Sequence, residues 1–364
     1  MNILFISAAS SIHTERWVNA LVEKGNQVTL VSLPDHQVHQ NKINSNVQIE
    51  YLPFYGNKGY YFNAFALRKI YKKSKPDIVN VHYASGYGTL ARIAKIPDTI
   101  LSVWGSDVYD FPYQSKWKMK VIKRNLKYAR RIASTSHVMA EQVKTLIGDV
   151  SITVTPFGVD IDLFRKMPEV THEGFVVGTV KTLSSKYGID TIIKAFALFC
   201  QRVGDTGSVR LVIYGRGESE QKLRELCKKE QIEDKVYFGG FIPNNKVPQI
   251  LNEMDVCCFG SRMDSESFGV AAVEAMACEI PVIATNVDGF KEVISVEECG
   301  FIVHRDAPEE MAECILKLYH SAELRNRVGK NGRKQVLQNY NWDNNMETML
   351  TLYKNVRGDM QRDG

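Results

Sequence analysis

The feature that most constrains the fold is the repeated alternation of short apolar runs with stretches of helical periodicity along nearly the whole chain. In the first half, the apolar runs cover residues 3–7, 27–33, 78–82 and 99–103. In the second half, they cover residues 174–180, 209–214, 236–238, 255–259, 282–284 and 300–303. Strands that alternate with helices form parallel sheets that are covered on both faces. The sequence therefore predicts an α/β fold with two doubly wound domains.

The boundary between the two domains is predicted within residues 156–173. Prolines, a glycine and several acids interrupt the periodicity there, as is typical of a linker. We therefore expect domains at residues 1–165 and 166–340, followed by a terminal segment at 341–364. Because parallel sheets bind ligands at the carboxyl ends of their strands, a ligand site is expected in a cleft between the two domains.

Composition and cysteine content are those of an ordinary soluble chain. Its 364 residues, of which 44% are apolar, are enough for two separate cores. No apolar run is long enough to cross a bilayer, and the apolar N-terminus lacks a basic leader, which predicts a first strand. The seven cysteines include no Cys-x-x-Cys pair, a pattern that favours a reduced, cytoplasmic protein. Cys257 and Cys258 would face opposite sides of a strand, so no metal site is expected there.

Positive charge is concentrated in the first half of the chain. Between Lys116 and Arg131 there are eight basic residues and no acid, with interleaved apolar residues that include Trp117, Val121, Ile122 and Leu126. Two interpretations are open: a helix that lies on an anionic membrane or a polyanionic acceptor, and the solvated face of a domain helix. A second basic run at 68–75 favours the membrane. No nucleic-acid-binding module accompanies the charge, so nucleic acid is not an expected partner.

The most specific chemistry lies between residues 255 and 278. A polar turn that contains Glu266 leads into good helix formers at 270–278, in which Glu274 is the one carboxylate. A helix that is apolar on nearly all sides is buried, and a buried carboxylate needs a hydrogen-bond donor. The amides that open this helix at Gly269 favour an anion such as phosphate. A nucleotide sugar would satisfy both features, and a core helix whose carboxylate is satisfied by protein groups is the alternative.

The segment from Glu266 to Glu274 resembles the Glu-x7-Glu signature of the retaining glycosyltransferases of family 4, the group 1 glycosyltransferases. Further motifs follow the family's order, at 104–107 (Trp-Gly-Ser-Asp), 155–160 (Thr-Pro-Phe-Gly-Val-Asp), 255–261, 274–278 and 281–289. Their order and spacing cover most of the chain. The resemblance implies the GT-B fold: two facing Rossmann-like domains, an acceptor side in the first, donor binding in the second, and a final helix that crosses back to the first.

The resemblance also implies roles for residues of the second domain. Lys181 and Lys186 would neutralise the donor diphosphate, with Lys181 standing where relatives carry an arginine, which grips phosphate better. Glu274 would accept hydrogen bonds from the ribose, and Glu266 would contact the transferred sugar. Further donor contacts are expected from the backbone at Ser267, Phe268, Gly269 and Val270. Near the nucleotide base we expect Gly215 and Ile242; Gly215 does not begin a dinucleotide fingerprint, because Glu220 stands at its third glycine.

The reaction implied by the resemblance is metal-independent and retains the configuration of the sugar. In the front-face mechanism the departing phosphate takes the acceptor proton, so no catalytic dyad is needed. The expected catalytic residues are Glu266, Lys186 and Asp107, without metal or cofactor. Asp160 and Asp162 resemble an Asp-x-Asp metal motif, but the preceding Pro-Phe-Gly-Val favours a turn and helix cap.

Acceptor-side candidates lie in the strand-exit loops of the first domain. They are His13, Arg16, His82, Trp104 and Asp107. Trp104 stands where many relatives carry a histidine, and His82 is the nearest replacement. Asp107 would orient hydroxyls of the acceptor or the sugar. The loop at residues 9–11 is Ala-Ser-Ser where many relatives have glycines, which makes close backbone approach to phosphate less favourable.

Together these observations predict a hexosyltransferase that uses a nucleoside diphosphate sugar. A UDP-sugar is the expected donor by its frequency in the family, and a GDP-sugar is the second choice. The expected acceptor is a surface polysaccharide, a lipopolysaccharide or a lipid-linked glycan, and the expected place is the cytoplasm or the inner face of the cell membrane. Two alternatives stay open: a nucleotide-sugar epimerase of the same fold, for which no acid/base set is visible, and a non-catalytic sugar-binding partner subunit.

Overall fold

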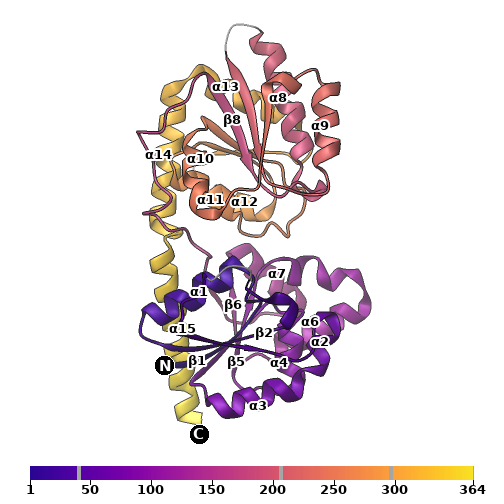
Figure 1. Ribbon diagram of the computed structural model, residues 1–364, viewed down its shortest axis with the longest axis vertical. Coiled ribbons are helices and arrows are strands. Elements are labelled where there is room, and N and C mark those ends of the chain that lie inside the picture. The colour runs from indigo at the N-terminus through magenta and orange to yellow at the C-terminus, as the bar shows by residue number, and fades with distance from the viewer. Residues whose placement is uncertain (39–41, 205–207, 295–297, 364) are drawn as a thin grey trace. The chain divides into compact units, whose positions relative to one another are not determined.

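The chain forms two α/β units, each with a parallel sheet between layers of helices (Figure 1). This computed structural model describes residues 1–38, 42–204, 208–294 and 298–363. Unit 1 comprises Met1–Phe157 with Asn345–Gly364, and unit 2 comprises Gly158–Asn344. The division therefore lies within the boundary region predicted at 156–173, before the domain limit expected after residue 165, and the chain rejoins unit 1 at Asn345.

The sheet of unit 1 has seven parallel strands in the order β3-β2-β1-β4-β5-β6-β7. The strands are β1 (Asn2–Ile6), β2 (Gln27–Ser32), β3 (Val47–Tyr51), β4 (Ile78–His82), β5 (Thr99–Val103), β6 (Arg131–Ser134) and β7 (Ile152–Val154). The strand order reverses between β1 and β4. At such a reversal the loops after the two strands diverge and leave room for a ligand.

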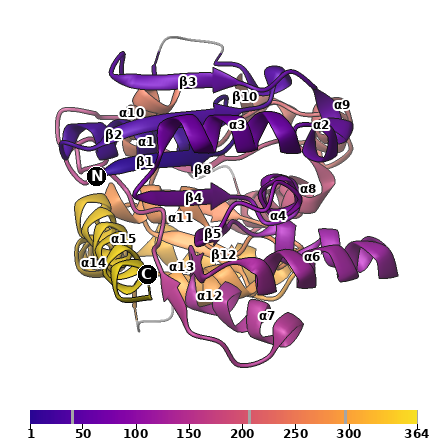
Figure 2. The ribbon, with the colours of Figure 1, turned by 90° about the horizontal axis from the view of Figure 1, so that it is seen from below.

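The helices of unit 1 cover both faces of this sheet. They are α1 (Ile12–Glu23), α2 (Gly56–Phe62), α3 (Ala64–Ser74), α4 (Tyr87–Ile93), α5 (Ser106–Tyr109), α6 (Lys116–Tyr128), α7 (His137–Ile147) and, at the C-terminus, α15 (Trp342–Asp363). Figure 2 shows α3, α4 and α6 next to one another. The C-terminal helix is fixed to unit 1 by Tyr353, whose buried hydroxyl donates to Asn80 Oδ1 at 2.8 Å, and by ion pairs of Lys24 with Glu347 and of Arg131 with Asp359.

Unit 2 repeats this architecture with six parallel strands in the order β10-β9-β8-β11-β12-β13. They are β8 (Phe175–Val180), β9 (Val209–Tyr214), β10 (Val236–Gly240), β11 (Val256–Phe259), β12 (Val282–Thr285) and β13 (Phe301–Val303). The helices are α8 (Ile189–Val203), α9 (Glu220–Lys229), α10 (Val247–Asn252), α11 (Val270–Ala277), α12 (Asp288–Val293), α13 (Pro308–His320) and α14 (Ala322–Asn339). Here the order reverses between β8 and β11, so the loops after these two strands diverge.

The predicted α/β class with two parallel sheets is confirmed. The predicted strands match because central strands are buried on both faces and read as continuous apolar runs: β4, β5, β11 and β12 are buried at every position. All seven cysteines are buried free thiols. Among the described residues, no helix is both long enough and apolar enough to cross a membrane.

Candidate functional site

In unit 2, the loops that follow β8 and β11 bring a lysine and a glutamate together. The Lys181 ammonium lies 2.6 Å from Oε2 of Glu266, and these side chains are only 15% and 11% exposed. The Ser261 hydroxyl donates to the same carboxylate oxygen at 3.4 Å. A largely buried ion pair with an added hydrogen bond holds both groups in place. The structure thus joins two residues that the sequence had placed in separate contacts.

A second cation joins this pair over an aromatic ring. The ammonium groups of Lys181 and Lys186 lie 4.7 Å and 4.8 Å from the ring centroid of Tyr187. The negative face of an aromatic ring attracts cations and offsets part of the repulsion between them. Tyr187 was assigned no role from the sequence, although it follows Lys186 directly. The arrangement gathers two positive charges where a bound diphosphate could be neutralised.

Glycines let the loops after β8, β9 and β11 touch backbone to backbone. Gly215, with φ of +142°, lies so close to Lys181 that an added Cβ would sit 1.9 Å from the Lys181 carbonyl oxygen. A Cβ on Gly188 would sit 2.0 Å from the carbonyl oxygen of Gly260. Gly215 therefore supports the backbone of Lys181. Its expected closeness to a nucleotide base stays a prediction, as does that of the half-buried Ile242.

Arg262, which the sequence did not single out, ties the same loops together. Its guanidinium contacts Asp190 at 2.8 Å and Asp306 at 2.6 Å, and donates to the carbonyl of Ser185 at 2.5 Å. Burial opposes the charge of Asp190, but the hydrogen bond and charge of Arg262 outweigh it and lower the pKa of Asp190. These partners lie far from Arg262 in sequence, so no local pattern could reveal them. The brace fixes the turn that leads to Glu266.

Helix α11 starts where the predicted phosphate cradle was placed. Gly269 caps it with φ of +75°, and five of its eight residues are buried. Glu274 is half-buried, and the Asn244 amide lies 3.5 Å from its Oε1, so a donor does come from another segment. Ser267 and Phe268 are each 3% exposed, and the Phe268 ring packs 5.4 Å from that of Tyr340. Their side chains are therefore enclosed by protein, and the expected contacts of their backbone with a donor stay predictions.

In unit 1, three of the residues considered on the acceptor side form an aromatic cluster with Phe157. The His13 ring stacks on Phe157 with centroids 3.9 Å apart, and the Trp104 ring meets His13, His82 and Phe157 edge-on at 5.5, 5.1 and 5.6 Å. Burial and the nearby Arg16 lower the pKa of His13 to about 4. Burial and His13 lower the pKa of His82 to about 3. Both rings are therefore neutral at pH 7.

His82 and Asp107 occupy interior positions. His82 is 1% exposed, and its Nε2 lies 2.8 Å from Asn80 Oδ1. Asp107 is fully buried, and its carboxylate accepts hydrogen bonds from the amides of Ala84, Trp104 and Gly105 at 2.7, 3.1 and 2.9 Å. Burial raises the pKa of Asp107, although these amides oppose the rise. The observed role of Asp107 is to shape the loops after β4 and β5, and the expected contacts of both side chains with hydroxyls stay predictions.

The loop after β1 uses its backbone donors internally. The amide of Ala9 donates to Ser32 Oγ at 3.0 Å, and that of Ser10 donates to the His36 carbonyl at 3.0 Å. Two amides that a glycine-rich phosphate loop would offer are therefore already occupied.

Asp160 lies in a turn, as its sequence context favoured. Its Oδ1 accepts from the amides of Asp162 and Leu163 at 3.0 and 2.9 Å, which confirms the turn interpretation. Across the described ranges, no group of three or more His, Cys, Asp or Glu is arranged to hold a metal ion.

The basic segment is helix α6, and its apolar side faces the protein. Val121, Ile122 and Leu126 are buried, because α6 packs against α4 and α7. These three residues are therefore not available to a membrane, and the expectation that the basic face of this helix could meet one stays a prediction. Trp117, by contrast, is 56% exposed, and the lysines of the outer face are solvated.

Comparison with protein families finds matches to both halves of the chain. The family described as glycosyl transferase 4-like matches residues 2–136, and that described as glycosyl transferases group 1 matches residues 160–335. An uncharacterised glycosyltransferase of Methanocaldococcus jannaschii is 27% identical over 64% of this chain and 58% of its own length. The capsular polysaccharide biosynthesis glycosyltransferase CapM of Staphylococcus aureus is 29% identical over 78% of each chain.

Solved structures share the whole fold. Sucrose-phosphate synthase of Thermosynechococcus elongatus superposes with a TM-score of 0.84 at 19% identity, over 98% of this chain and 99% of that one. HepE of Anabaena, in a complex with UDP, superposes with a TM-score of 0.79 at 17% identity, over 98% and 100% of the two chains. At such identities these structures establish the fold.

Proposed function

The chain belongs to the group 1, family 4-like glycosyltransferases and has their GT-B fold, and from this we propose that it transfers a hexose from a nucleoside diphosphate sugar to a glycan or lipid-linked acceptor. The observation that carries the donor assignment is the pair of ammonium groups over Tyr187, one of them bonded to Glu266. UDP bound to HepE and the polysaccharide role in the name of CapM support a UDP-sugar donor and a polysaccharide-type acceptor. A GDP-sugar is the second donor to test.

The proposed reaction breaks the bond between the anomeric carbon and the diphosphate oxygen. The electron pair goes to the diphosphate, and Lys181 and Lys186 neutralise the charge that develops there. Fixed cations in a largely enclosed site stabilise such a charge without reorganisation. The acceptor hydroxyl bonds to the anomeric carbon on the face that the diphosphate leaves and gives its proton to the departing phosphate oxygen, so configuration is retained. In this proposal Glu266 orients the sugar, and no metal is required.

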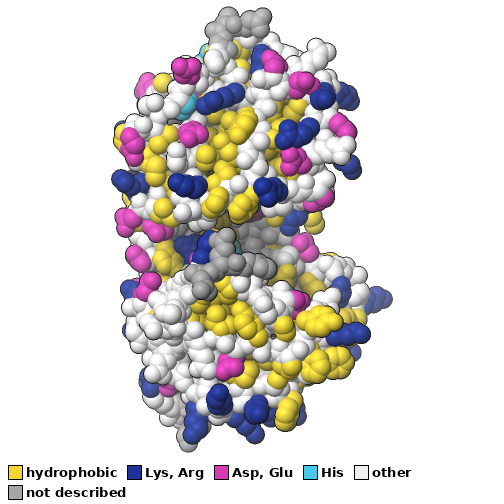
Figure 3. Space-filling view, viewed as in Figure 1, with side chains coloured by type: hydrophobic (Ala, Val, Ile, Leu, Met, Phe, Trp, Pro, Cys, Tyr) yellow, Lys and Arg dark blue, Asp and Glu magenta, His cyan; other side chains and the backbone are white. Residues whose placement is uncertain are grey.

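The proposal places the acceptor at a membrane surface, which unit 1 would dock. Exposed aromatic side chains gather on α2, on α3 and on the loop before α2: Phe54, Tyr55, Tyr61, Phe62 and Phe65. Two more, Tyr113 and Trp117, lie just before α6 and on its first turn. Figure 3 shows hydrophobic side chains together with Lys and Arg at the lower right, where α2 and α6 lie in Figure 1. Aromatic residues favour the membrane–water interface, and each basic residue near an anionic surface contributes about 1 kcal/mol.

Vesicle flotation tests this docking. Replacing Lys120, Lys123, Arg124 and Lys127 together by glutamine should lower binding to vesicles that contain phosphatidylserine and leave the low binding to neutral vesicles unchanged. Equal binding of both proteins to anionic vesicles at low salt would reject docking by this surface.

Donor turnover tests the transferase function. Lys186→Met and Glu266→Gln should each lower release of UDP from UDP-glucose and related donors, while Lys222→Met, at an exposed lysine on α9, should not. Turnover by the wild type should survive a metal chelator. Unchanged turnover in both variants would overturn the proposed mechanism. Formation of an epimerised donor without any acceptor would instead identify an epimerase, and no turnover with any donor would favour a binding subunit.

A further inference from the structure

Unit 1 contains a hollow of about 430 Å³ beside the loop that follows β4. Its walls come from α2, from the loop after β4 with the start of α4, and from residues 111–118 at the start of α6. The hollow therefore lies at the carboxyl edge of the sheet, where doubly wound folds bind ligands.

Five aromatic side chains line this hollow: Tyr60, Tyr61, Tyr83, Phe111 and Trp117. Asn57, Ser85, Thr89 and Lys118 add polar groups between them. A sugar ring has an apolar face of C–H groups and a rim of hydroxyls, so it suits flat aromatic walls with a few hydrogen-bonding side chains. The Thr89 hydroxyl already bonds to the Ser85 carbonyl and to Asn125. An acyl or prenyl chain would offer no hydrogen bond to the Asn57 amide or the Ser85 hydroxyl and no negative charge to Lys118.

Two tyrosines of the wall are fixed in place: Tyr83 by a strained backbone and hydrogen bonds, and Tyr60 by close packing. Tyr83 adopts φ of +73°, which is unusual for a residue with a side chain and costs about 1–3 kcal/mol. Its amide donates to the Ser102 carbonyl at 2.9 Å, and its hydroxyl lies 2.7 Å from Ser106 Oγ. Tyr60 packs against Gly86, where an added Cβ would fall 2.6 Å from the ring. Strain of this kind gathers at functional sites.

The rim of the hollow is exposed to solvent, and the positive charge beside it, that of Lys118, is not paired with a carboxylate. Trp117 is 56% and Tyr61 40% exposed. The Lys118 ammonium lies 5.3 Å from the centre of the Phe111 ring and donates to the neutral Gln114 side chain. In the part of the chain that the structure describes, no carboxylate lies within ion-pair distance of Lys118. A ligand that carries a carboxylate or phosphate would complete this charge.

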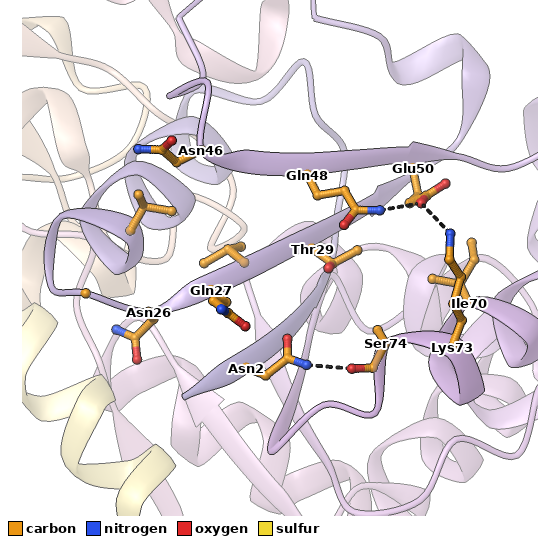
Figure 4. A pocket seen from close by; sticks show the side chains of 13 residues that line it. Asn2, Asn26, Gln27, Thr29, Asn46, Gln48, Glu50, Ile70, Lys73 and Ser74 are labelled. Carbon is orange, nitrogen blue, oxygen red and sulfur yellow. Dashed lines mark hydrogen bonds and ion pairs between the residues drawn. The ribbon is translucent and has the colours of Figure 1, made fainter.

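A second hollow in the same unit lies at the amino ends of β1 and β2 and differs from the aromatic hollow in its lining (Figure 4). Several of its polar groups bond with one another or with the backbone: the side-chain amide of Asn2 with the Ser74 carbonyl, and Gln48 and Lys73 with Glu50. None of its described lining residues is aromatic, so the described part of its wall offers no stacking surface.

The aromatic hollow also adjoins the residues considered on the acceptor side. The Tyr83 ring lies 6.4 Å from that of Trp104, and Ser106, which holds the Tyr83 hydroxyl, precedes Asp107. We propose that the hollow binds a sugar unit of the acceptor that bears an anionic group, with the ring stacked on the aromatic wall and the anion near Lys118. This inference rests on the proposed transfer to a glycan acceptor.

Binding of immobilised oligosaccharides tests this inference. The full-length protein would be applied to an array of neutral oligosaccharides, uronate-bearing oligosaccharides and polyprenyl phosphates. We expect retention on uronate-bearing oligosaccharides. That retention should fall at least tenfold in Trp117→Ala and in Lys118→Met, whereas weaker retention on neutral oligosaccharides should fall in Trp117→Ala only. Phe65→Ala, at an 82% exposed ring that does not line the hollow, is the matched control.

Two outcomes would overturn the inference. One is oligosaccharide retention that Trp117→Ala and Lys118→Met leave unchanged, or no oligosaccharide retention at all. The other is retention confined to polyprenyl phosphates, which would assign the hollow to a lipid. UDP affinity, measured on the same proteins, tests unit 2 separately. Binding of UDP without retention on glycans would reject only the inference about the hollow. Absence of both UDP binding and glycan retention would also reject the proposed function.

Discussion

The two units present opposite chemistry at corresponding places in their sheets. In unit 2, the loops after β8 and β11 carry two ammonium groups and a paired carboxylate. In unit 1, rings from α1, from the end of β4 and from the loop after β5 pack together, and the two histidines among them are held neutral by burial. The same architecture thus supports a site built on an ion pair in one unit and a site built mainly on aromatic rings in the other. That difference suits a donor whose leaving group gains charge and an acceptor sugar that stacks on rings.

The two regions are also held in place differently. The charged loops of unit 2 depend on glycines that let backbones touch and on the Arg262 brace. The loops of unit 1 depend on ring packing and on the Asp107 carboxylate that binds three amides. Substitutions in the two regions should therefore have different effects on activity and stability.

The largest effect is expected from removing a cation in unit 2. Lys186→Met should lower the rate constant of transfer by about 100- to 1000-fold, a typical loss when one fixed group that stabilises a developing charge is removed. His13→Phe keeps the ring stack on Phe157 in unit 1 and should lower that rate far less. Steady-state kinetics with a UDP-sugar measures both, and a larger loss in His13→Phe would reverse the assignment of charge to unit 2.

A smaller but still large effect is expected on stability when the backbone contact at Gly215 is blocked. Gly215→Ala should lower the free energy of unfolding by about 3 kcal/mol, because the residue has φ of +142° and no room for a Cβ. Gly358→Ala is the control: it lies in α15 with nothing within 4 Å of an added Cβ and should be neutral or stabilising. Urea denaturation measures both, and equal midpoints would contradict the close packing of the unit 2 loops.

The neutral histidines of unit 1 predict a pH dependence. The pKa of His82 is about 3 in the folded protein against 6.5 as its ordinary value, so below pH 6.5 the unfolded chain binds a proton that the folded one does not. The contribution of His82 to the free energy of unfolding is fully present above pH 6.5 and is lost as the pH falls towards 3. Between pH 7 and 5 the loss should be about 2 kcal/mol.

His82→Asn should remove this part of the pH dependence. Its free energy of unfolding should fall about 2 kcal/mol less than that of the wild type between pH 7 and 5. Matching slopes for the two proteins in urea denaturation would show that His82 is protonated in the folded state, and the contrast between the units would weaken.

The central strands and the donor-side segment could be predicted from sequence because their signals are local. Strands buried on both faces read as apolar runs, and Glu266, Lys181 and Lys186 lie in ordered motifs. The edge strands β3 and β7 were missed because most of their residues are at least partly exposed and form no apolar run. The strand β6 was also missed, since it has only four residues.

Other features depend on contacts between distant segments. Arg262 lies 72 residues from Asp190, and no local sequence pattern predicts their contact. The burial of His82 and Asp107 follows from the rings and amides folded around them, which a strand-exit position does not show. The apolar residues of α6 were visible in the sequence, but which side they faced was decided by packing against α4 and α7.

The central claim is that unit 2 binds the nucleoside diphosphate through Glu274 and the two lysines. Calorimetric titration of UDP, with GDP in parallel, into the full-length wild type, Glu274→Gln and Glu309→Gln tests it most directly. Glu309 lies exposed on α13 and serves as the matched control. The account predicts that Glu274→Gln binds about tenfold more weakly, as expected for the loss of a charged hydrogen bond, while Glu309→Gln binds like the wild type. No binding of either nucleotide by the wild type, or unchanged binding by Glu274→Gln, would contradict the account.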